Sequence, residues 1–493
     1  MTTFPLPLLS IAVLAPVVGA IAVARTGAVR LARLLAMLSV LTGLAASLAA
    51  LWLVVPQRGT MAEPWEFPLL GAAAPLLAAD TLGCLALSLI ASLALFTITL
   101  APRRDLERRE LARMLLLLAA ISLAYSSNHL LLLLGGWGLA SMLVATVSHK
   151  EADGEAASRA TLLMRIVLTG GFGALAAAVF LLGREGAAAG LLSPYALHLL
   201  SKTPMSGGEV TFALLMMAVL FTKGIFPFHS WVVTAFDRGS LLTSNLFVSA
   251  HLGAFVIAKV AIPVMPFMAR RALPLLSDVA LFTMCYMAVL AVRERSPRRI
   301  LALLFVGQAS SILVGLESAT EAGVTGALVH WMVVAVAVTS LASVLRLLEV
   351  RVGSRLGTTE FLGLANRFPR LAVFFLIAGL ALVGLPGTLG FCAEDLLIHG
   401  TLESHPQLGV ALPVATALFA FHMLRLFSKL FLGRQTAGPG LVPDAVARER
   451  VGLTALIAFL VLFGIAPEWI VDRQASAAIP LVEELRIAQA LLR

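Results

Sequence analysis

Charged side chains are scarce in this sequence. Only 13% of its 493 residues are charged, whereas 60% are hydrophobic. A soluble globular domain carries about 25% charged residues, so the composition excludes a large water-soluble domain and indicates a polytopic membrane protein. The net charge of +9 does not require a nucleic-acid partner, because basic residues gather in the short loops beside membrane spans.

The chain also has few of the residues and motifs that carry common chemistry. Its three cysteines, Cys84, Cys285 and Cys392, lie far apart in apolar segments, and no pair has the spacing of a metal site. There is no Walker loop, no dinucleotide fingerprint and no HExxH motif. We therefore expect no metal or other cofactor in this chain, no energy input from ATP and no catalytic site of its own.

Long apolar runs dominate what is present. Runs of about 17 residues or more are long enough to span a bilayer as helices. Fourteen segments qualify, near residues 5–24, 31–55, 80–101, 111–126, 129–147, 160–183, 211–236, 241–265, 273–293, 298–316, 323–348, 371–402, 407–432 and 451–471. The first run follows no basic segment, so we expect a retained span and not a signal peptide. The predicted fold class is an all-α polytopic membrane protein with about 14 transmembrane helices.

Basic residues alternate between the loops that separate these spans. If the N-terminus is outside, the inside loops are the Arg-rich ones and the outside loops hold few basic residues, which is the pattern of the positive-inside rule. The inside loops then contain Arg25, Arg30, Arg103, Arg104, Arg108, Arg109, Arg238, Arg293, Arg298, Arg299, Arg346, Arg351 and Arg355. We expect both termini outside, in a bacterial cytoplasmic (inner) membrane.

One apolar run is interrupted by a proline beside a lysine. In the segment Phe221–Trp231, Pro227 predicts a helix break near Lys223 and Gly224. Irregular backbone at membrane depth is tolerated only against protein or a wet cavity, and a lysine there is costly. We interpret Lys223 as a proton-path residue. The alternative, a lysine that snorkels to the interface, is disfavoured by Pro227 and His229 beside it.

A second interrupted run lies five spans later, where Pro386 and Gly387 predict another break. Discontinuous helices at matching positions indicate inverted repeats around a transport path. The expected organisation is N-terminal helices in 1–110, a first five-helix repeat in 111–265, a second in 266–433, and an inside loop, last span and amphipathic tail in 434–493. The tail Ile479–Arg493 is expected along the membrane surface.

Ionisable residues inside the spans supply a candidate ion path, because a translocated proton needs titratable groups that waters can bridge. The path residues are Lys223, His229, His251, Lys259, His330, Glu394, Asp395 and His422. Structural alternatives stay open: His330 and His422 as interhelical hydrogen-bond donors, and His251 with Lys259 as packing and snorkelling.

The segment Lys223–Trp231, K-G-I-F-P-F-H-S-W, resembles the K-x-x-x-P-F-H-x-W segment of the proton-translocating, antiporter-like subunits of respiratory complex I and Mrp antiporters. The resemblance runs from about Leu111 to Gly433 and includes Gln308, His330 and Arg425. It implies fourteen spans, two inverted five-span repeats and a role in proton or Na+/H+ translocation.

Several positions depart from this pattern. The family's fifth span reads W-E, and its glutamate pairs with the broken-helix lysine, whereas this sequence has Trp137-Gly138. Asp237 and Glu394 are open candidates for the missing partner. The family's lysine in the second broken helix is Glu394 here, and its histidine after the first broken helix falls near Phe247, about one turn from His251.

The string G-L-P-G-T-L-G-F-x-A-E-D after Val383 looks more like DabB, the membrane subunit of the DAB inorganic carbon pump. That resemblance implies an ion-conducting subunit that drives CO2 hydration to bicarbonate in a large cytoplasmic DabA-like partner, which resembles a β-carbonic anhydrase and carries the zinc. Two alternatives remain: a proton- or Na+/H+-translocating subunit of a respiratory, hydrogenase or Mrp-type complex, and a non-conducting membrane anchor.

Overall fold

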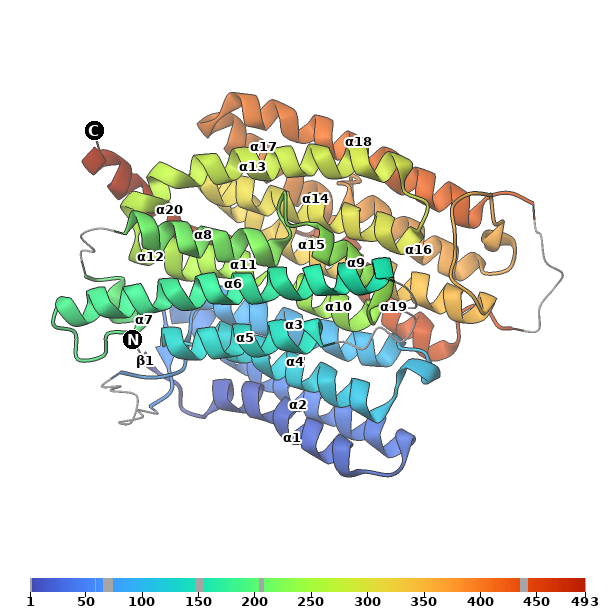
Figure 1. Cartoon of the computed structure of the whole chain (residues 1–493), viewed down its shortest axis with the longest axis horizontal. Helices are drawn as coiled ribbons and strands as arrows, with labels where there is room; N and C mark the ends of the chain where they lie inside the picture. Colours follow the sequence, from blue (N-terminus) through green and yellow to red (C-terminus); the bar gives the residue numbers. More distant parts are fainter. Residues whose placement is uncertain are drawn as a thin grey trace.

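The computed structural model describes residues 2–57, 59–64, 74–146, 155–203, 208–434 and 442–492. These residues form a bundle of helices that run mostly along the long axis of the molecule (Figure 1). Among the described residues, nine helices are long and apolar enough to cross a membrane, or ten if one bent pair counts as a span. The predicted all-α polytopic class is confirmed.

The helices follow the expected runs closely. The N-terminal part contains α1 (Leu8–Arg25), α2 (Val29–Val54) and α3 (Thr81–Leu100). Next come α4 (Arg108–Ser126), α5 (Leu130–Ala145), α6 (Glu155–Ala188), α7 (Leu197–Leu200), α8 (Glu209–Lys223), α9 (Ser230–Arg238), α10 (Leu241–Ser249), α11 (Leu252–Val256), the π-helix η4 (Ile257–Ala261) and α12 (Ile262–Val264). The last part contains α13 (Pro266–Arg293), α14 (Pro297–Glu317), α15 (Glu321–Val352), α16 (Pro369–Leu382), α17 (Leu389–Ser404), α18 (Pro406–Phe431), α19 (Ala447–Ile465) and α20 (Glu468–Leu492). Short 3-10 turns lie at Val55–Gln57, Arg103–Asp105 and Leu364–Asn366.

Both predicted helix breaks are present. The first separates α8 from α9, where Gly224 has a φ of 67°. The second separates α16 from α17, where Gly384 and Gly387 have φ values of 71° and 86°. Glycine adopts positive φ without steric cost, and proline lacks the backbone donor that a continuous helix needs. Pro227 and Pro386 lie within the two breaks.

A third interruption was not predicted. The expected continuous span 241–265 is broken at His251, which has a φ of 48° and lies between α10 and α11. The π-helix η4 follows one turn later. Left-handed backbone costs a non-glycine residue roughly 1–2 kcal/mol, and π-bulges are frequent at functional sites. The distortion therefore draws attention to His251 on structural grounds alone.

Helices α14 and α15 form the centre of the bundle, and the central 18-residue windows of both are fully buried. Small residues let neighbouring helices approach closely. A Cβ atom on Gly326 of α15 would lie 2.6 Å from the backbone nitrogen of Leu397 on α17. The second broken helix is therefore held directly against the central helix.

The predicted amphipathic tail lies in helix α20, which begins at Glu468. Helix α20 turns by 80° from α19 and packs against α13 and α15. Gln474, Leu481 and Leu485 of α20 are buried, and the side-chain amide of Gln474 donates to the carbonyl oxygen of Leu328 at 3.5 Å. Other helices of the same chain thus cover Leu481 and Leu485, whereas Ile487 and Leu491 of the tail stay exposed.

A small sheet lies at the lower left of Figure 1, near α7 and the N-terminus. It pairs β1 (Thr2–Thr3) in parallel with β2 (Met61–Ala62), which is antiparallel to β3 (Ala78–Ala79). The buried Glu63 carboxylate follows β2 and accepts hydrogen bonds from the backbone N–H of Leu9 at 2.6 Å and of Ser10 at 3.0 Å. It thereby caps the first turn of α1, where a negative charge is favourable.

Candidate functional site: buried polar groups along the helix breaks

Lys223 lies inside the protein at the last position of α8. Its side chain is buried, and its Nζ atom lies 2.9 Å from Nδ1 of His251. Gly253 leaves room for the lysine stem, since a Cβ atom there would lie 2.7 Å from Cγ of Lys223. The amine points to an imidazole and not to a membrane interface, so the snorkelling alternative does not hold.

Among the described residues, no acid takes the place of the family's glutamate beside Lys223. A Cβ atom at Gly138 of α5 would lie 2.5 Å from Cε2 of Phe172 on α6, so the phenyl ring occupies the space that a larger side chain would need. None of the ion pairs between described residues includes Lys223. The two open candidates lie elsewhere: Asp237 interacts with Arg355 at 3.3 Å, and Glu394 lies at the second break.

An aromatic and imidazole cluster continues from His251 to α15. The His251 ring stacks on Phe305, with centroids 5.5 Å apart, and meets the edge of Trp331 at 5.7 Å. His330 is fully buried beside Trp331, and its Nε2 atom lies 3.2 Å from the carbonyl oxygen of Gln308. His330 is close enough to His251 and to Lys223 to interact electrostatically with both.

Several buried polar atoms in this cluster have no hydrogen-bond partner among the described residues. They are Nε2 of His251, Nδ1 of His330, both side-chain amide atoms of Gln308 and Nε1 of Trp331. Buried polar groups are hydrogen-bonded in the great majority of cases. So many unsatisfied atoms in one place set this cluster apart from an ordinary apolar helix interface.

Glu394 and Asp395 are neighbours in sequence with different surroundings. The Glu394 carboxylate packs on the second break, where a Cβ atom on Gly384 would lie 2.3 Å from its Oε2 atom. Asp395 is instead 53% exposed and lies 3.4 Å from the exposed His399. Only Glu394 is therefore placed inside the bundle.

The remaining predicted path residues lie apart from the cluster. Lys259 forms an ion pair of 2.6 Å with Asp80, the N-cap of α3. His229 begins α9, where its ring lies 5.6 Å from that of Tyr286. His422 is buried on α18 and hydrogen-bonds to the backbone of Ala288. The structure brings Lys223, His251 and His330 together. Lys259, His229 and His422 lie outside this cluster.

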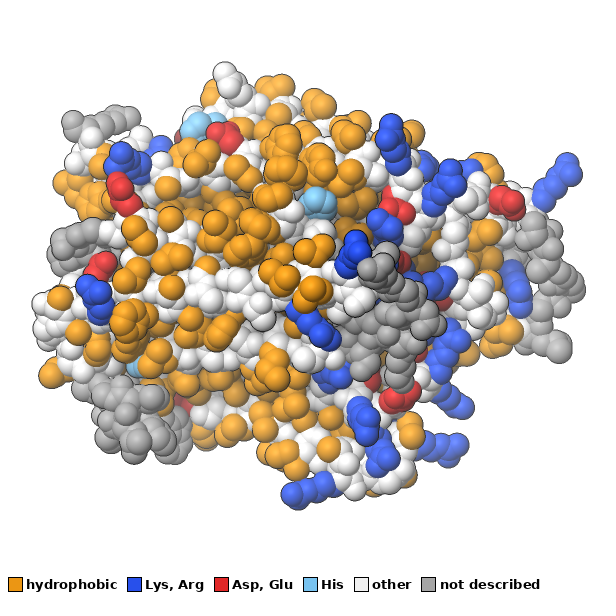
Figure 2. All heavy atoms as spheres, in the orientation of Figure 1, with side chains coloured by type: hydrophobic (Ala, Val, Ile, Leu, Met, Phe, Trp, Pro, Cys, Tyr) orange, Lys and Arg blue, Asp and Glu red, His pale blue; other side chains and the backbone are white. Residues whose placement is uncertain are grey.

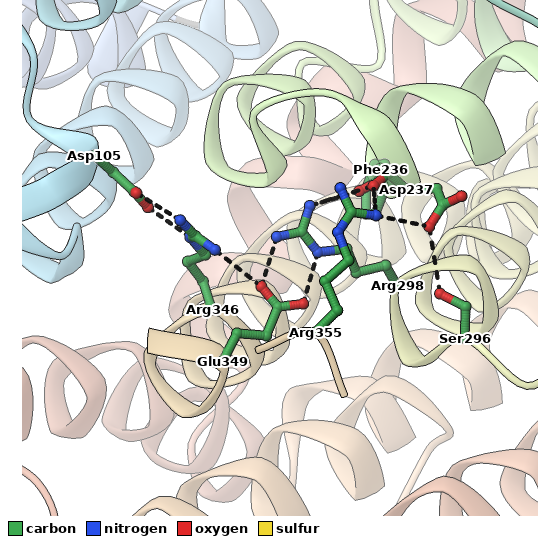
Figure 3. A network of polar contacts seen from close by, with 8 residues as sticks. All are labelled: Asp105, Phe236, Asp237, Ser296, Arg298, Arg346, Glu349 and Arg355. Carbon is green, nitrogen blue, oxygen red and sulfur yellow. Dashed lines mark hydrogen bonds and ion pairs between the residues drawn. The ribbon is translucent and has the colours of Figure 1, made fainter. Parts of the chain in front are cut away.

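A network of ion pairs at one end of the bundle was missed by sequence reasoning (Figure 3). Arg298 donates to Glu349 at 2.7 and 2.5 Å. Arg346 donates to Asp105 at 2.6 Å through two nitrogen atoms and to Glu349 at 3.1 Å. Bidentate arginine–carboxylate pairs are the strong ones. Glu349 could have indicated this network from the sequence, since an acidic residue within an apolar run needs a basic partner.

Comparison with known proteins agrees with this architecture. A family model described as NADH:quinone oxidoreductase/Mrp antiporter, TM, matches residues 127–420. The chain is similar to NADH-quinone oxidoreductase subunit M of Rickettsia conorii, with 26% identity over 286 residues, which are 56% of this chain and 57% of that protein. The chain thus spans little more than half the length of this curated relative.

Two solved structures resemble the whole chain. A chain of respiratory complex I from Thermus thermophilus superposes with a TM-score of 0.85 and 25% identity, over 97% of this chain and 99% of that one. A chain of the Mrp complex from Dietzia sp. superposes with a TM-score of 0.84 and 21% identity, over 98% and 99%. This multi-pass membrane protein therefore belongs to the NADH:quinone oxidoreductase/Mrp antiporter family of membrane subunits.

Proposed function

We propose that the chain moves protons across an inner membrane as one subunit of a multi-subunit complex of the respiratory or Mrp type. The observation that carries the proposal is the buried Lys223 at a helix break, in contact with His251. A lysine enclosed at membrane depth is expensive, so its presence indicates a function that needs a group able to gain and lose a proton there.

The Lys223–His251 contact is suited to passing a proton on. An imidazole has two ring nitrogens, so it accepts a proton at one and releases a proton from the other. Nδ1 of His251 faces the amine, and Nε2 is free of described partners. The proton accepted from Lys223 would thus leave from the opposite side of the ring, toward His330 and Gln308, where water can bridge the unsatisfied atoms.

Glu394 would continue the route in the second half of the molecule. Its carboxylate lies on the second break, with Oε1 buried and without a described partner. The two breaks thus each carry one ionisable side chain on the inner side of the bundle. In this arrangement a proton moves between the two halves of the molecule. The distribution of arginine predicts that the N-terminus is outside.

The test is a flux measurement on the chain purified with its partners. The complex is reconstituted in vesicles, a membrane potential is applied, and internal pH is followed with and without Na+. Proton uptake above that of empty vesicles is expected. Flux equal to empty vesicles would refute proton translocation and favour the non-conducting anchor, and uptake that requires Na+ would assign an antiporter.

A second candidate is the DAB carbon pump, supported by Trp137-Gly138 and by the string that ends in Glu394-Asp395. In that case the ion path would drive CO2 hydration in a DabA-like partner that holds zinc. The identity of the co-purified partner separates the two candidates. A large soluble zinc protein favours the carbon pump, and quinone-linked, hydrogenase or antiporter subunits favour the first proposal.

A further inference from the structure

A groove lies between α6, α9, α13 and α14, on the far side of α9 from the interior of the bundle. Its volume is about 370 Å³. The lining residues that matter here are Arg238, Arg293, Arg299, Ser230, Thr234 and Leu290. Helix α9 forms its floor, running from His229 at the first break to Arg238 at its end. The groove therefore reaches from an arginine-rich mouth to the middle of a broken span.

The acidic groups of the groove are already engaged by other partners. Asp237 accepts from Arg355 at 3.3 Å and from Ser296 at 3.4 Å. Glu294 pairs with Arg299 at 3.0 Å and accepts from the backbone N–H of Arg295 at 2.8 Å. Neither carboxylate is left to neutralise a further cation, so additional basic residues in the groove contribute net positive charge.

Two such basic residues are present. Within the part of the chain that the structure describes, Arg238 and Arg293 form no ion pair, and Nη1 of Arg238 is buried without a hydrogen-bond partner. A guanidinium is the preferred side chain for binding phosphate, because its N–H groups match two oxygen atoms at once. The mouth of the groove thus offers a site for a phosphate or similar anion.

The surroundings of the groove are apolar on both sides. Leu162, Leu163 and Ile166 of α6 are 57%, 53% and 54% exposed, and Val289 and Val292 of α13 are 63% and 52% exposed. Figure 2 shows the same arrangement for the face in view, with hydrophobic side chains across the middle and Lys and Arg gathered toward the right-hand end. A ligand in this groove would meet cations at its head and apolar side chains along its length.

We infer that the groove binds an anionic phospholipid, with its phosphate between Arg238 and Arg293 and its acyl chains along α6 and α13. Basic pockets between transmembrane helices are suited to such headgroups. A free phosphate ion would use the arginines but gain nothing from the apolar flanks. This inference does not depend on proton translocation, because it concerns the outer surface of α9 and not the Lys223 cluster.

The test is native mass spectrometry of the full chain in detergent, titrated with phosphatidylglycerol, phosphatidylcholine or inorganic phosphate. The wild-type chain should bind phosphatidylglycerol at least tenfold more tightly than phosphatidylcholine, and inorganic phosphate should not compete. The double variant R238Q/R293Q should lose about thirtyfold in phosphatidylglycerol affinity, since each of the two basic residues contributes roughly 1 kcal/mol to anionic lipid binding. The matched control R30Q/R104Q removes two exposed arginines outside the groove and should bind as the wild type does.

Three outcomes would overturn the inference. Equal loss in the control pair would show a general charge effect, and competition by inorganic phosphate would assign a free-anion site. Equal binding of both lipids by the wild type would show that the groove does not select a headgroup charge. If the double variant fails to fold, V233W tests the same point by filling the groove with all charges kept, and unchanged lipid affinity in V233W would also exclude this site.

Discussion

The Nζ atom of Lys223 and the Nδ1 atom of His251 lie 2.9 Å apart, and each residue stands where a helix is interrupted. Lys223 ends α8 before the first break, and His251 separates α10 from α11 with left-handed backbone. Two adjacent helices therefore both lose regular hydrogen bonding at the same place. Among the described residues, the amine of Lys223 therefore faces an imidazole and no carboxylate.

Substitution of Lys223 by alanine should abolish proton flux and leave assembly intact. The amine is the only ionisable group of the first break that contacts His251 among the described residues. We expect flux in reconstituted vesicles to fall at least tenfold, with normal co-purification of partners. Lys259→Ala is the control, because Lys259 pairs with Asp80 away from the cluster. Equal loss in both variants would contradict a special role for Lys223.

Substitution of His251 should separate backbone strain from function. Asparagine tolerates the left-handed region better than other non-glycine residues, so His251→Asn should unfold at a temperature no lower than the wild type. His251→Ala keeps the strain and should be less stable than the asparagine variant by about 1 kcal/mol. Both should lose flux, because neither can relay a proton. Thermal unfolding in detergent and vesicle flux provide the two readouts, and retained flux in either variant would exclude the relay.

The space at Gly138 can be probed with a single methyl group. A Cβ atom there would lie 2.5 Å from the Phe172 ring, whereas a Cβ atom at Gly135 on the same helix meets nothing within 4 Å. We expect Gly138→Ala to cost about 1–3 kcal/mol through overpacking, and Gly135→Ala to be neutral or stabilising. The double variant G138A/F172L should recover part of the loss. No difference between the two alanine variants would show that the ring yields easily.

Removing the charge of Glu394 should reduce proton flux much more than removing the charge of Asp395. Glu394→Gln keeps the shape of the side chain but cannot release a proton, so we expect at least a tenfold loss of flux. Asp395→Asn should lose less than twofold, because that side chain is exposed beside His399. Normal flux in the Glu394 variant would confine the path to the first repeat.

The ion-pair network around Glu349 should matter for stability. Glu349 pairs with both Arg298 and Arg346, and the side chains of Glu349 and Arg298 are 3% and 7% exposed. Glu349→Gln leaves the buried guanidinium of Arg298 without its carboxylate, whereas Arg346 keeps Asp105, and removing one member of a buried pair costs about 3–5 kcal/mol. Glu321→Gln, at the exposed start of the same helix, should cost less than about 1 kcal/mol. Similar unfolding temperatures for the two variants would show that Glu349 is not stabilising.

The spans and the two proline-containing breaks were predictable because their causes are local, whereas the break at His251 was not predicted. Hydrophobic length sets where a helix can cross a membrane, and Pro227 and Pro386 interrupt a helix whatever surrounds them. The side-chain partners were not predictable in the same way. The contact of Lys223 with His251, and the filling of the Gly138 site by Phe172, depend on how separate helices are aligned.

The partners of the charged side chains were not predictable for the same reason, because they depend on how distant helices are aligned. Asp105 and Arg346 are far apart in sequence, yet they form a bidentate pair. Lys259 was grouped with the path because it follows His251 in one apolar run, but it lies within the π-helix and pairs with Asp80. The amphipathic pattern of the tail is a local signal, whereas the packing of α20 on α13 and α15 joins segments that are distant in sequence and could not be predicted from it.

The position of α20 has a consequence for biosynthesis. This helix covers α13 and α15, and the Gln474 side chain reaches the α15 backbone two residues before His330. Chains are made and inserted from the N-terminus, so α15 emerges from the ribosome well before the helix that covers it. Until residues 468–492 have been synthesised, the flank of α15 beside the polar cluster lacks the helix that covers it in the finished fold.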